Sequence, residues 1–288
     1  MKPEVQKTFK VAVTLCLVCS VVVSALAVGL KGIQEEQKEK FRQQSILEAA
    51  GLWEEGEDPS ELYAALINPV VVDLQTKSAT QRYEAGDKKL ELESLLRNPE
   101  MFDEMTQEQD VAGIAKREAY TTIYEVREGN KKTGTLKTVV LPIRGRGLWS
   151  TLYGFIALDM TAATDGSAGL KVAGLTYYKH GETPGLGGEV DNQLWKDKWP
   201  GKLIFDDSWN VKVEVAKNAS SDYQVDALSG ATLTSNGVSN MLKFWLGEDG
   251  FGPYLESVVA DVPAPTPDAD TPAAPESAGE PAESPTDA

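Results

Sequence analysis

A run of twenty uncharged residues near the N-terminus constrains this chain more than any other feature. Residues 11–30 are mostly Val, Leu and Ala. At about 1.5 Å per residue, a helix of this length covers roughly the 30 Å hydrocarbon core of a bilayer. Three lysines precede the run, which predicts that residues 1–10 stay in the cytoplasm and that the bulk of the chain is exported.

A cleaved signal peptide is the alternative, because Ser24-Ala25-Leu26-Ala27 fits a cleavage site. The uncharged run continues past that site and is longer than the apolar core of a typical signal peptide, which favours a retained transmembrane helix. We therefore expect a single-pass membrane protein whose main domain is exported.

Charge and residue usage argue against several classes of function. The net charge of −16 repels phosphate backbones and argues against nucleic-acid binding. Both cysteines, Cys16 and Cys19, lie inside the apolar run, so the exported part has no cysteine nucleophile, disulfide or cysteine-ligated cluster. His180 is the only histidine, and we expect it to be a solvated residue beside its loop. No residues recur at metal-binding spacing, so we expect no metal site.

The exported part divides into a stalk, a domain and a tail. Residues 31–118 are predicted to form a helical stalk ending near Gly51 and the N-terminal part of the exported domain. Within them we expect a second helix capped by Asp58, a strand at 70–74 and a helix at 87–96. Residues 261–288 hold seven acidic residues, no basic residue and seven prolines, which predicts a disordered tail.

Residues 119–260 are predicted to form the main domain. Alternating and β-rich runs predict strands, with turn residues at 128–131 and 164–167; the strands are expected at 120–126, 135–143, 152–158, 169–178 and 211–215. A closing helix follows, because apolar residues recur at helical spacing between Val238 and Leu246, and Thr234 or Ser235 is expected to cap it. The fold class is therefore α+β, with an antiparallel sheet and packed helices after a single transmembrane helix.

A hydroxyl-rich segment before that closing helix is the first candidate site. It reads Ser229-Gly230-Ala231-Thr232-Leu233-Thr234-Ser235. Gly230 allows a ligand to approach the backbone closely, and the free N–H groups of a helix N-terminus favour an anion such as a flavin phosphate. An ordinary Ser/Thr-rich helix cap has the same composition, and these features alone favour that interpretation over a phosphate site.

Two further segments could border a flat heteroaromatic ring. Residues 180–188 contain four glycines and one proline, which makes a shaped loop with much exposed backbone. Residues 144–150 carry Arg144 and Arg146 for an anionic ring, and Leu148 and Trp149 to pack on it. Surface turns with no ligand explain both segments equally well at this point, and whether either arginine touches a ring stays open.

The motifs together resemble the C subunits of the sodium-translocating NADH:quinone reductases, a family of covalent FMN-binding proteins. The matching segments keep the order and spacing of that family; they are the N-terminal anchor, residues 145–150, 153–155, 180–190, 228–238 and 244–247, and 250–254. The Pro-rich tail after Asp261 is not part of that pattern.

The resemblance implies a specific cofactor site. Thr232 would carry FMN through a phosphoester, in the pattern Asp-x-x-Ser/Thr-Gly-Ala-Thr that begins at Asp226. A flavin transferase, with FAD as donor and magnesium as cofactor, would read Asp226 together with the residues before Thr232. The remaining cofactor-binding residues would be Ser229, Gly230, Ala231, Thr234, Ser235, Glu182, Thr183, Gly185, Leu186, Gly187, Leu148, Trp149 and Ser150.

The resemblance also implies a function. The chain would relay single electrons between an iron–sulfur centre and a second covalently bound flavin in neighbouring subunits of a sodium-pumping NADH:quinone oxidoreductase, a translocase. It would have no catalytic acid–base residue of its own. It would lie in a bacterial inner membrane as a single-pass protein, with its main domain on the periplasmic, outer side. Two alternatives are the equivalent FMN subunit of an Rnf-type electron transport complex and a membrane-anchored binding module without cofactor.

Overall fold

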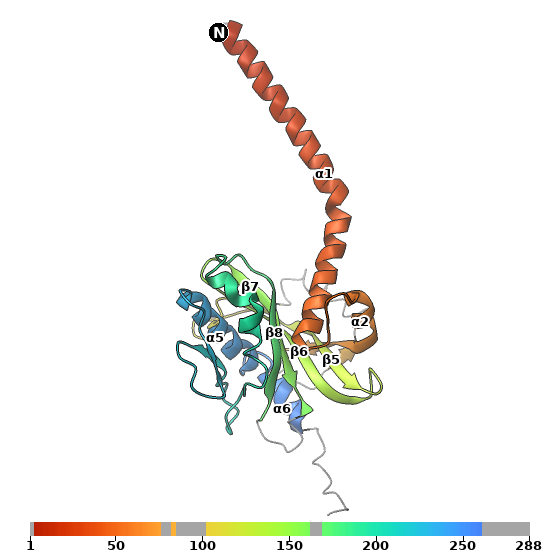
Figure 1. Cartoon of the computed structure of the whole chain (residues 1–288), viewed down its shortest axis with the longest axis vertical. Helices are drawn as coiled ribbons and strands as arrows, with labels where there is room; N and C mark the ends of the chain where they lie inside the picture. The colour runs from red at the N-terminus through yellow and green to blue at the C-terminus, as the bar shows by residue number, and fades with distance from the viewer. Residues whose placement is uncertain (1–2, 76–81, 85–101, 162–168, 261–288) are drawn as a thin grey trace, which may run out of the picture.

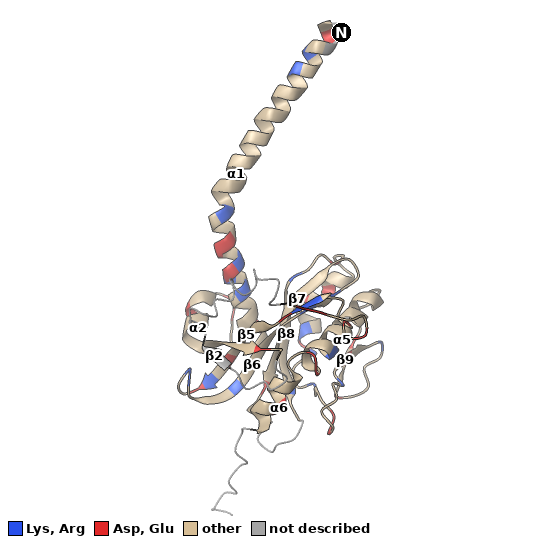
Figure 2. Ribbon diagram, turned by 180° about the vertical axis from the view of Figure 1, so that it is seen from behind, with Lys and Arg blue, Asp and Glu red and all other residues tan. Residues whose placement is uncertain are grey.

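A long N-terminal helix projects from the folded domain (Figure 1). The computed structural model describes residues 3–75, 82–84, 102–161 and 169–260. In it, α1 (Pro3–Ala49) runs unbroken through the apolar run and the predicted stalk. Figure 2 shows its middle free of charged residues, with basic residues on both sides. By length and composition α1 can cross a membrane, and none of its most apolar stretch is buried by the rest of the chain.

The core of the domain is one antiparallel sheet. Its strands lie in the order β2-β1-β5-β6-β7-β8, and consecutive strands from β5 to β8 pair with their neighbours. They are β1 (Ile67–Asp73), β2 (Arg82–Glu84), β5 (Tyr120–Glu128), β6 (Thr135–Arg146), β7 (Thr151–Asp159) and β8 (Lys171–Lys179). The predicted α+β class with an antiparallel sheet is confirmed.

Successive side chains of a strand point to opposite sides, and in this sheet both sets pack against other elements. Both faces of the sheet are therefore covered. Tyr124 and Phe155 pack on the end of α1, and α2 (Pro59–Leu66) completes this layer. Leu141 and Ile156 face the other side, where α5 (Thr232–Leu246), α6 (Gly252–Ala260) and the segment between β8 and α5 cover them.

Smaller elements fill the connections and correct one strand prediction. They are β3 (Phe102–Glu104), β4 (Lys116–Glu118), η4 (Gly187–Asp191), α4 (Gln193–Lys196), β9 (Glu214–Ala216) and β10 (Gln224–Asp226). The strand expected at 211–215 was wrong in extent: β9 spans three residues and pairs in parallel with β10, outside the main sheet. Val213 and Val215 do face the core. The alternation therefore predicted correctly which side chains are buried, but not which strand this segment pairs with.

Helix ends depend on local chemistry, and one cap prediction was wrong. The Asp58 carboxylate accepts from the backbone N–H groups of Ser60 and Glu61, as expected of the cap of α2. In contrast, Ala231 occupies the N-cap of α5 without a side-chain hydrogen bond. Thr234 and Ser235 lie inside the first turn of α5, where their hydroxyls bond to other segments. The predictions for 87–96, 164–167 and the tail fall outside the described residues.

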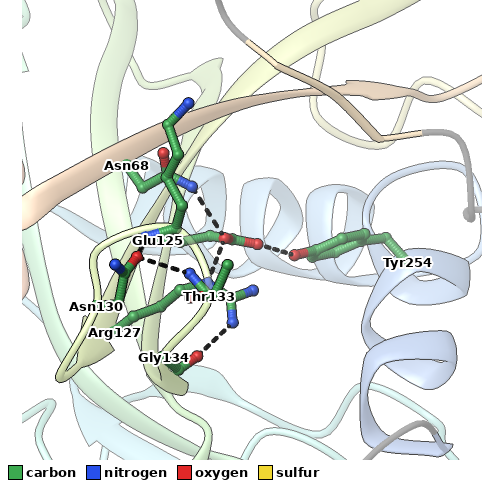
Figure 3. Close-up of polar contacts among 8 residues, drawn as sticks. Asn68, Glu125, Arg127, Asn130, Thr133, Gly134 and Tyr254 are labelled. Atoms are coloured by element: carbon green, nitrogen blue, oxygen red, sulfur yellow. Dashed lines mark hydrogen bonds and ion pairs between the residues drawn. The ribbon is translucent and has the colours of Figure 1, made fainter.

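A buried carboxylate joins α6 to the sheet (Figure 3). Glu125 in β5 is fully buried, and its carboxylate lies 2.9 Å from Nε of Arg127. It also accepts hydrogen bonds from Asn68 Nδ2 at 3.4 Å and from the Tyr254 hydroxyl at 3.5 Å. A buried charge is tolerated only with such partners. The network therefore links α6 to β1 and β5, and Arg127 also donates to the carbonyl of Gly134 in the β5–β6 hairpin.

Candidate functional site

The three candidate segments meet at one end of the sheet. The turn at 147–150 joins β6 to β7, and the loop at 180–187 leaves the end of β8, which runs antiparallel to β7. The first turn of α5 reaches the same end of the sheet from the face that α5 covers. Antiparallel pairing of β7 and β8 brings the turn at 147–150 beside the loop at 180–187, and packing of α5 on the sheet adds a segment more than 80 residues after that turn.

Glu182 joins the three segments with one carboxylate. Its Oε1 accepts from the backbone N–H groups of Trp149 and Ser150, both at 3.0 Å. Its Oε2 accepts from the backbone N–H of Leu148 at 3.1 Å and from the hydroxyl of Thr234 at 2.7 Å. Both carboxylate oxygens are therefore hydrogen-bonded within the protein. The side chain fixes the turn at 147–150 and the start of α5 relative to the loop at 180–187.

The charge of Glu182 is stabilised by these donors. The residue is 5% exposed, and burial by itself raises the pKa of the carboxyl group. The hydrogen bonds from Thr234 and from the backbone at 148–150 outweigh burial, so the pKa lies below its ordinary value of 4.5. Glu182 is thus a buried carboxylate ion at neutral pH.

Two glycines leave room for this carboxylate. A Cβ on Gly147 would lie 2.7 Å from Glu182 Oε1, and one on Gly187 would lie 2.6 Å from Thr234 Oγ1. Real Cβ atoms essentially never approach so closely. The glycine content of these segments therefore reflects close packing around Glu182 as well as loop flexibility. Gly147 was absent from the predicted site residues, and only its place before Leu148 hinted at this role.

The start of α5 presents an exposed hydroxyl at a helix N-terminus. Thr232 is the first residue of α5 and is exposed, as is Ser229 before it. Gly230 has a φ of +71°, a conformation that glycine adopts without strain, and it turns the chain into the helix. The Ser235 hydroxyl accepts from the backbone N–H of Leu228 at 3.1 Å, which holds that turn closed.

The segments that meet at this helix start carry exposed apolar side chains. Trp149 is 71% exposed and Leu233 is 60% exposed, while Leu148 and Leu186 are exposed by 41% and 44%. Leu186 lies beside Gly230, since a Cβ there would meet its Cδ2 at 3.0 Å. Exposed apolar surface next to free helix N–H groups suits a ligand with a flat apolar ring and an anionic group. An FMN fits both features.

The rest of the 180–187 loop is held by its own backbone. The carbonyl of Thr183 accepts from the N–H groups of Leu186 and Gly188, at 3.1 and 2.9 Å. Gly185 has a φ of +76°, which completes this turn. Thr183 and Gly185 are exposed on the same loop as Leu186, so this loop reaches the site in a fixed conformation.

Other predicted residues have partners away from Thr232. The Arg144 guanidinium forms an ion pair with Glu118 and lies over the ring of Trp245, with 5.4 Å to its centroid. Arg146 is exposed at the end of β6. His180 was expected to be solvated, but its side chain is 14% exposed and its Nε2 lies 2.6 Å from Asp191 Oδ2.

Asp226 closes the segment that leads into α5. Its carboxylate lies 3.0 Å from Lys198 Nζ and accepts from the backbone N–H of Ala219 at 3.2 Å. The hydrogen bond and charge of Lys198 hold the pKa of Asp226 below its ordinary range. The Asp226 carbonyl also accepts from the indole N–H of Trp195. The side chain is half-buried, so part of it stays accessible from solvent.

Comparison with known families defines the class of protein first. Residues 147–247 match the family described as FMN-binding domain. This match contains the turn at 147–150, the Glu182 loop and the whole of α5. The chain is therefore a protein with an FMN-binding domain, joined to an N-terminal helix that can cross a membrane.

The particular family follows from full-length relatives. The chain is 45% identical over 261 residues to the C subunit of the Na(+)-translocating NADH-quinone reductase of Yersinia pestis, covering 88% of this chain and 93% of the relative. The corresponding C subunit of Pseudomonas aeruginosa is 43% identical over 262 residues, covering 88% and 95%. The chain belongs to the family of Na(+)-translocating NADH-quinone reductase C subunits, and the resemblance read from the motifs is confirmed.

Solved structures share this fold. The crystal structure of Shewanella oneidensis NqrC aligns with a TM-score of 0.63 and 29% identity, covering 77% of this chain and 99% of that one. The crystal structure of the C subunit from Parabacteroides distasonis aligns with a TM-score of 0.56 and 22% identity, covering 78% and 96%. At that identity, the second likeness concerns the fold alone.

Proposed function

We propose that this chain carries FMN as a phosphoester on Oγ of Thr232. The exposed hydroxyl at the start of α5 carries the proposal, because it stands where helix N–H groups favour the negative charge of a phosphate. Thr234 and Ser235 are less suited to attachment, since both are buried and their hydroxyls are already hydrogen-bonded. Membership of the family and the FMN-binding domain support the same cofactor.

The apolar side chains around Thr232 would hold the isoalloxazine ring. Leu148, Trp149, Leu186 and Leu233 offer exposed apolar surface, and packing against a ring would remove part of it from water. FMN supplies the electron-carrying chemistry when bound, and the protein contributes position and electrostatics. Glu182 contributes by fixing the backbone at 148–150. Ser229, Gly230 and Ala231 would line the phosphate.

We further propose that the chain relays electrons as a membrane-anchored flavoprotein subunit of a sodium-pumping NADH:quinone oxidoreductase. The donor and acceptor would be cofactors of neighbouring subunits, an iron–sulfur centre and a second flavin. No acid–base residue of this chain takes part. Helix α1 would anchor the chain in the inner membrane with the domain on the periplasmic side, as the basic residues before the apolar run favour.

Maturation would require a flavin transferase outside the cytoplasm. Asp226 is half-buried and its carboxylate is held by Lys198, so it presents a fixed shape six residues before Thr232. We propose that the transferase reads Asp226 with the turn at 229–231. Covalent attachment would keep the cofactor on a protein whose domain lies outside the cell membrane.

A denaturing gel under ultraviolet light tests the attachment. The full chain, produced in cells with an active flavin transferase, is expected to give a fluorescent band and an intact mass raised by FMN less one water. The Thr232→Val variant is expected to fold but give a dark band and the bare mass. Thr135→Val, an exposed threonine at the start of β6, is the matched control and should stay fluorescent.

Two outcomes would contradict the proposal. Fluorescence that persists in Thr232→Val would place the ester on another hydroxyl. A dark band and bare mass for the unchanged chain would support an anchored binding module without flavin.

A further inference from the structure

The only histidine of the chain lies where β8 enters the loop that borders the candidate flavin site. His180 directly follows β8 and precedes Glu182 by two residues. Its Nε2 lies 2.6 Å from Asp191 Oδ2, and its Nδ1 lies 3.2 Å from the backbone nitrogen of Glu182. Both ring nitrogens therefore have a partner, one a carboxylate and the other a backbone N–H.

These two partners define the tautomer of the imidazole. A backbone N–H can only donate, so Nδ1 of His180 accepts and carries no proton. The proton is then on Nε2, which donates it to the Asp191 carboxylate. Asp191 thus favours the one form of the neutral ring in which Nδ1 can accept from Glu182.

Asp191 itself lies on a fixed segment. It is the last residue of η4 and directly follows Val190, which is fully buried in the core. Asn192 comes next and caps α4, where its Oδ1 accepts from the backbone N–H of Leu194 at 2.9 Å. The chain is therefore held on both sides of Asp191, and the His180 ring that binds to it has a defined position.

The bond to Glu182 belongs to a set that fixes the first residues of the loop. The backbone N–H of Gly181 donates to Ser150 Oγ at 2.7 Å, and this hydroxyl donates to Glu182 Oε1 at 3.2 Å. The turn at 147–150 thus holds the start of the loop through Ser150, while the imidazole holds the backbone of Glu182. The Glu182 carboxylate meets its donors on the turn and on α5 because its own backbone is held in this place.

A displacement of the Glu182 backbone would move the apolar side chains proposed to hold the isoalloxazine ring. Leu148 and Trp149 donate their backbone N–H groups to the Glu182 carboxylate. Leu186 lies four residues further along the loop, next to Gly230. The imidazole can therefore set the position of the ring through the loop.

We propose that His180 is a positioning residue of the flavin site. Its Nδ1 holds the Glu182 backbone, and Asp191 fixes the tautomer that this bond requires. The pair keeps the loop at 180–187 closed against the turn at 147–150, so that the isoalloxazine ring stays packed on its apolar side chains. This inference rests on the proposed function, because it takes the ring to lie against these segments.

Two matched substitutions separate the two nitrogens of His180. In His180→Asn, the amide oxygen stands near the place of Nδ1 and can accept from the N–H two residues further on, as asparagine does in turns. In His180→Gln, the amide reaches toward the place of Nε2 and Asp191, and the Glu182 N–H loses its acceptor. Neither amide adds a charge, so a difference between the two variants reports the position of the acceptor.

Quenching by iodide measures how well the ring is covered in the flavinylated full chain, because the covalent bond keeps the cofactor on every variant. His180→Gln is expected to raise the iodide-accessible share of the flavin about fivefold, since the closed loop loses one hydrogen bond of ordinary strength. His180→Asn is expected to match the wild type. Asp191→Ala should also raise this share, because the imidazole can then take the other tautomer, whereas the amide oxygen of Asp191→Asn still accepts from Nε2.

The outcomes that contradict this inference differ from those that contradict the proposed function. An unchanged share in His180→Gln, or an equal rise in His180→Gln and His180→Asn, would overturn the role of Nδ1. Wild-type accessibility in Asp191→Ala would overturn the role of Asp191. All variants are compared well below the lowest Tm among them, so unfolding does not contribute. In each of these cases a fluorescent gel band would leave the attachment standing, whereas a dark band for the unchanged chain would overturn both.

Discussion

Replacing Glu182 by glutamine removes one negative charge and changes one acceptor into a donor. The carboxylate accepts three backbone N–H groups, from Leu148, Trp149 and Ser150, and two hydroxyls, from Thr234 and Ser150. The amide oxygen of glutamine can keep the Trp149 and Ser150 donors. Its NH₂ group then faces the Leu148 N–H, so two donors meet, whereas the Thr234 hydroxyl can turn to accept.

The cost follows from these contacts. A buried N–H left without an acceptor costs about 1–3 kcal/mol. The remaining hydrogen bonds lose the assistance of the charge, which roughly halves their contribution. Relief from burying a charge offsets part of this. We expect Glu182→Gln to lower the free energy of unfolding by about 3 kcal/mol, which is a fall of roughly 6–12 °C in Tm for a domain of this size.

The same carboxylate gives a pH dependence of defined sign. The folded-state pKa of Glu182 lies below the ordinary 4.5, so its contribution to stability is present above that value. The contribution is lost as the pH falls through the folded-state pKa. Glu182→Gln should be less stable at neutral pH, and the difference from the wild-type chain should shrink as the pH falls below about 4.5.

Thermal unfolding of the full chain in detergent, followed by tryptophan fluorescence, measures both effects. Glu189→Gln is the control, because Glu189 lies in the next segment and accepts from Asn192 at 2.7 Å without joining other elements. A Tm for Glu182→Gln within about 1 °C of both the wild type and this control would refute the role assigned to the carboxylate.

Two further substitutions test the packing and the capping described above. Gly187→Ala should lower the free energy of unfolding by about 1–3 kcal/mol, because its Cβ would lie 2.6 Å from Thr234 Oγ1. Gly181→Ala is the control and should change the Tm little, since its Cβ would lie 3.4 Å from its nearest neighbour. Equal Tm values for the two variants would contradict this. Asp58→Ala should cost about 1 kcal/mol by uncapping α2, read from a denaturant midpoint shifted at an unchanged slope.

Sequence patterns predicted the helices and strands well where one local feature of the sequence determines the element. The uncharged run at 11–30 and the polar stalk after it form one helix, and Asp58 caps α2. The meander from β5 to β8 follows from alternating runs separated by short connections. The closing helix was also expected, although its start lies at Thr232 and not at a Ser or Thr cap.

Sequence patterns gave wrong predictions where a residue's partner lies on a distant segment. The alternation at 211–215 arises because Val213 and Val215 pack against the core, yet hydrogen bonding there comes from Ile204 and from β10. A period of two indicates one buried face and says nothing about which strand supplies the ladder. The same limit applies to His180, whose pairing with Asp191 requires η4 to fold back along β8.

By itself, the sequence determined the long apolar helix that can cross a membrane, the antiparallel domain and, through the motif ending at Thr232, the cofactor to test. These depend on composition and on residues close together in the chain, and both can be obtained from the sequence without a structure. Only the tertiary structure decided that Glu182 is a buried anchor and that Arg144 is paired with Glu118. Each of these depends on atoms distant in the chain, and their contacts exist only after the sheet has formed.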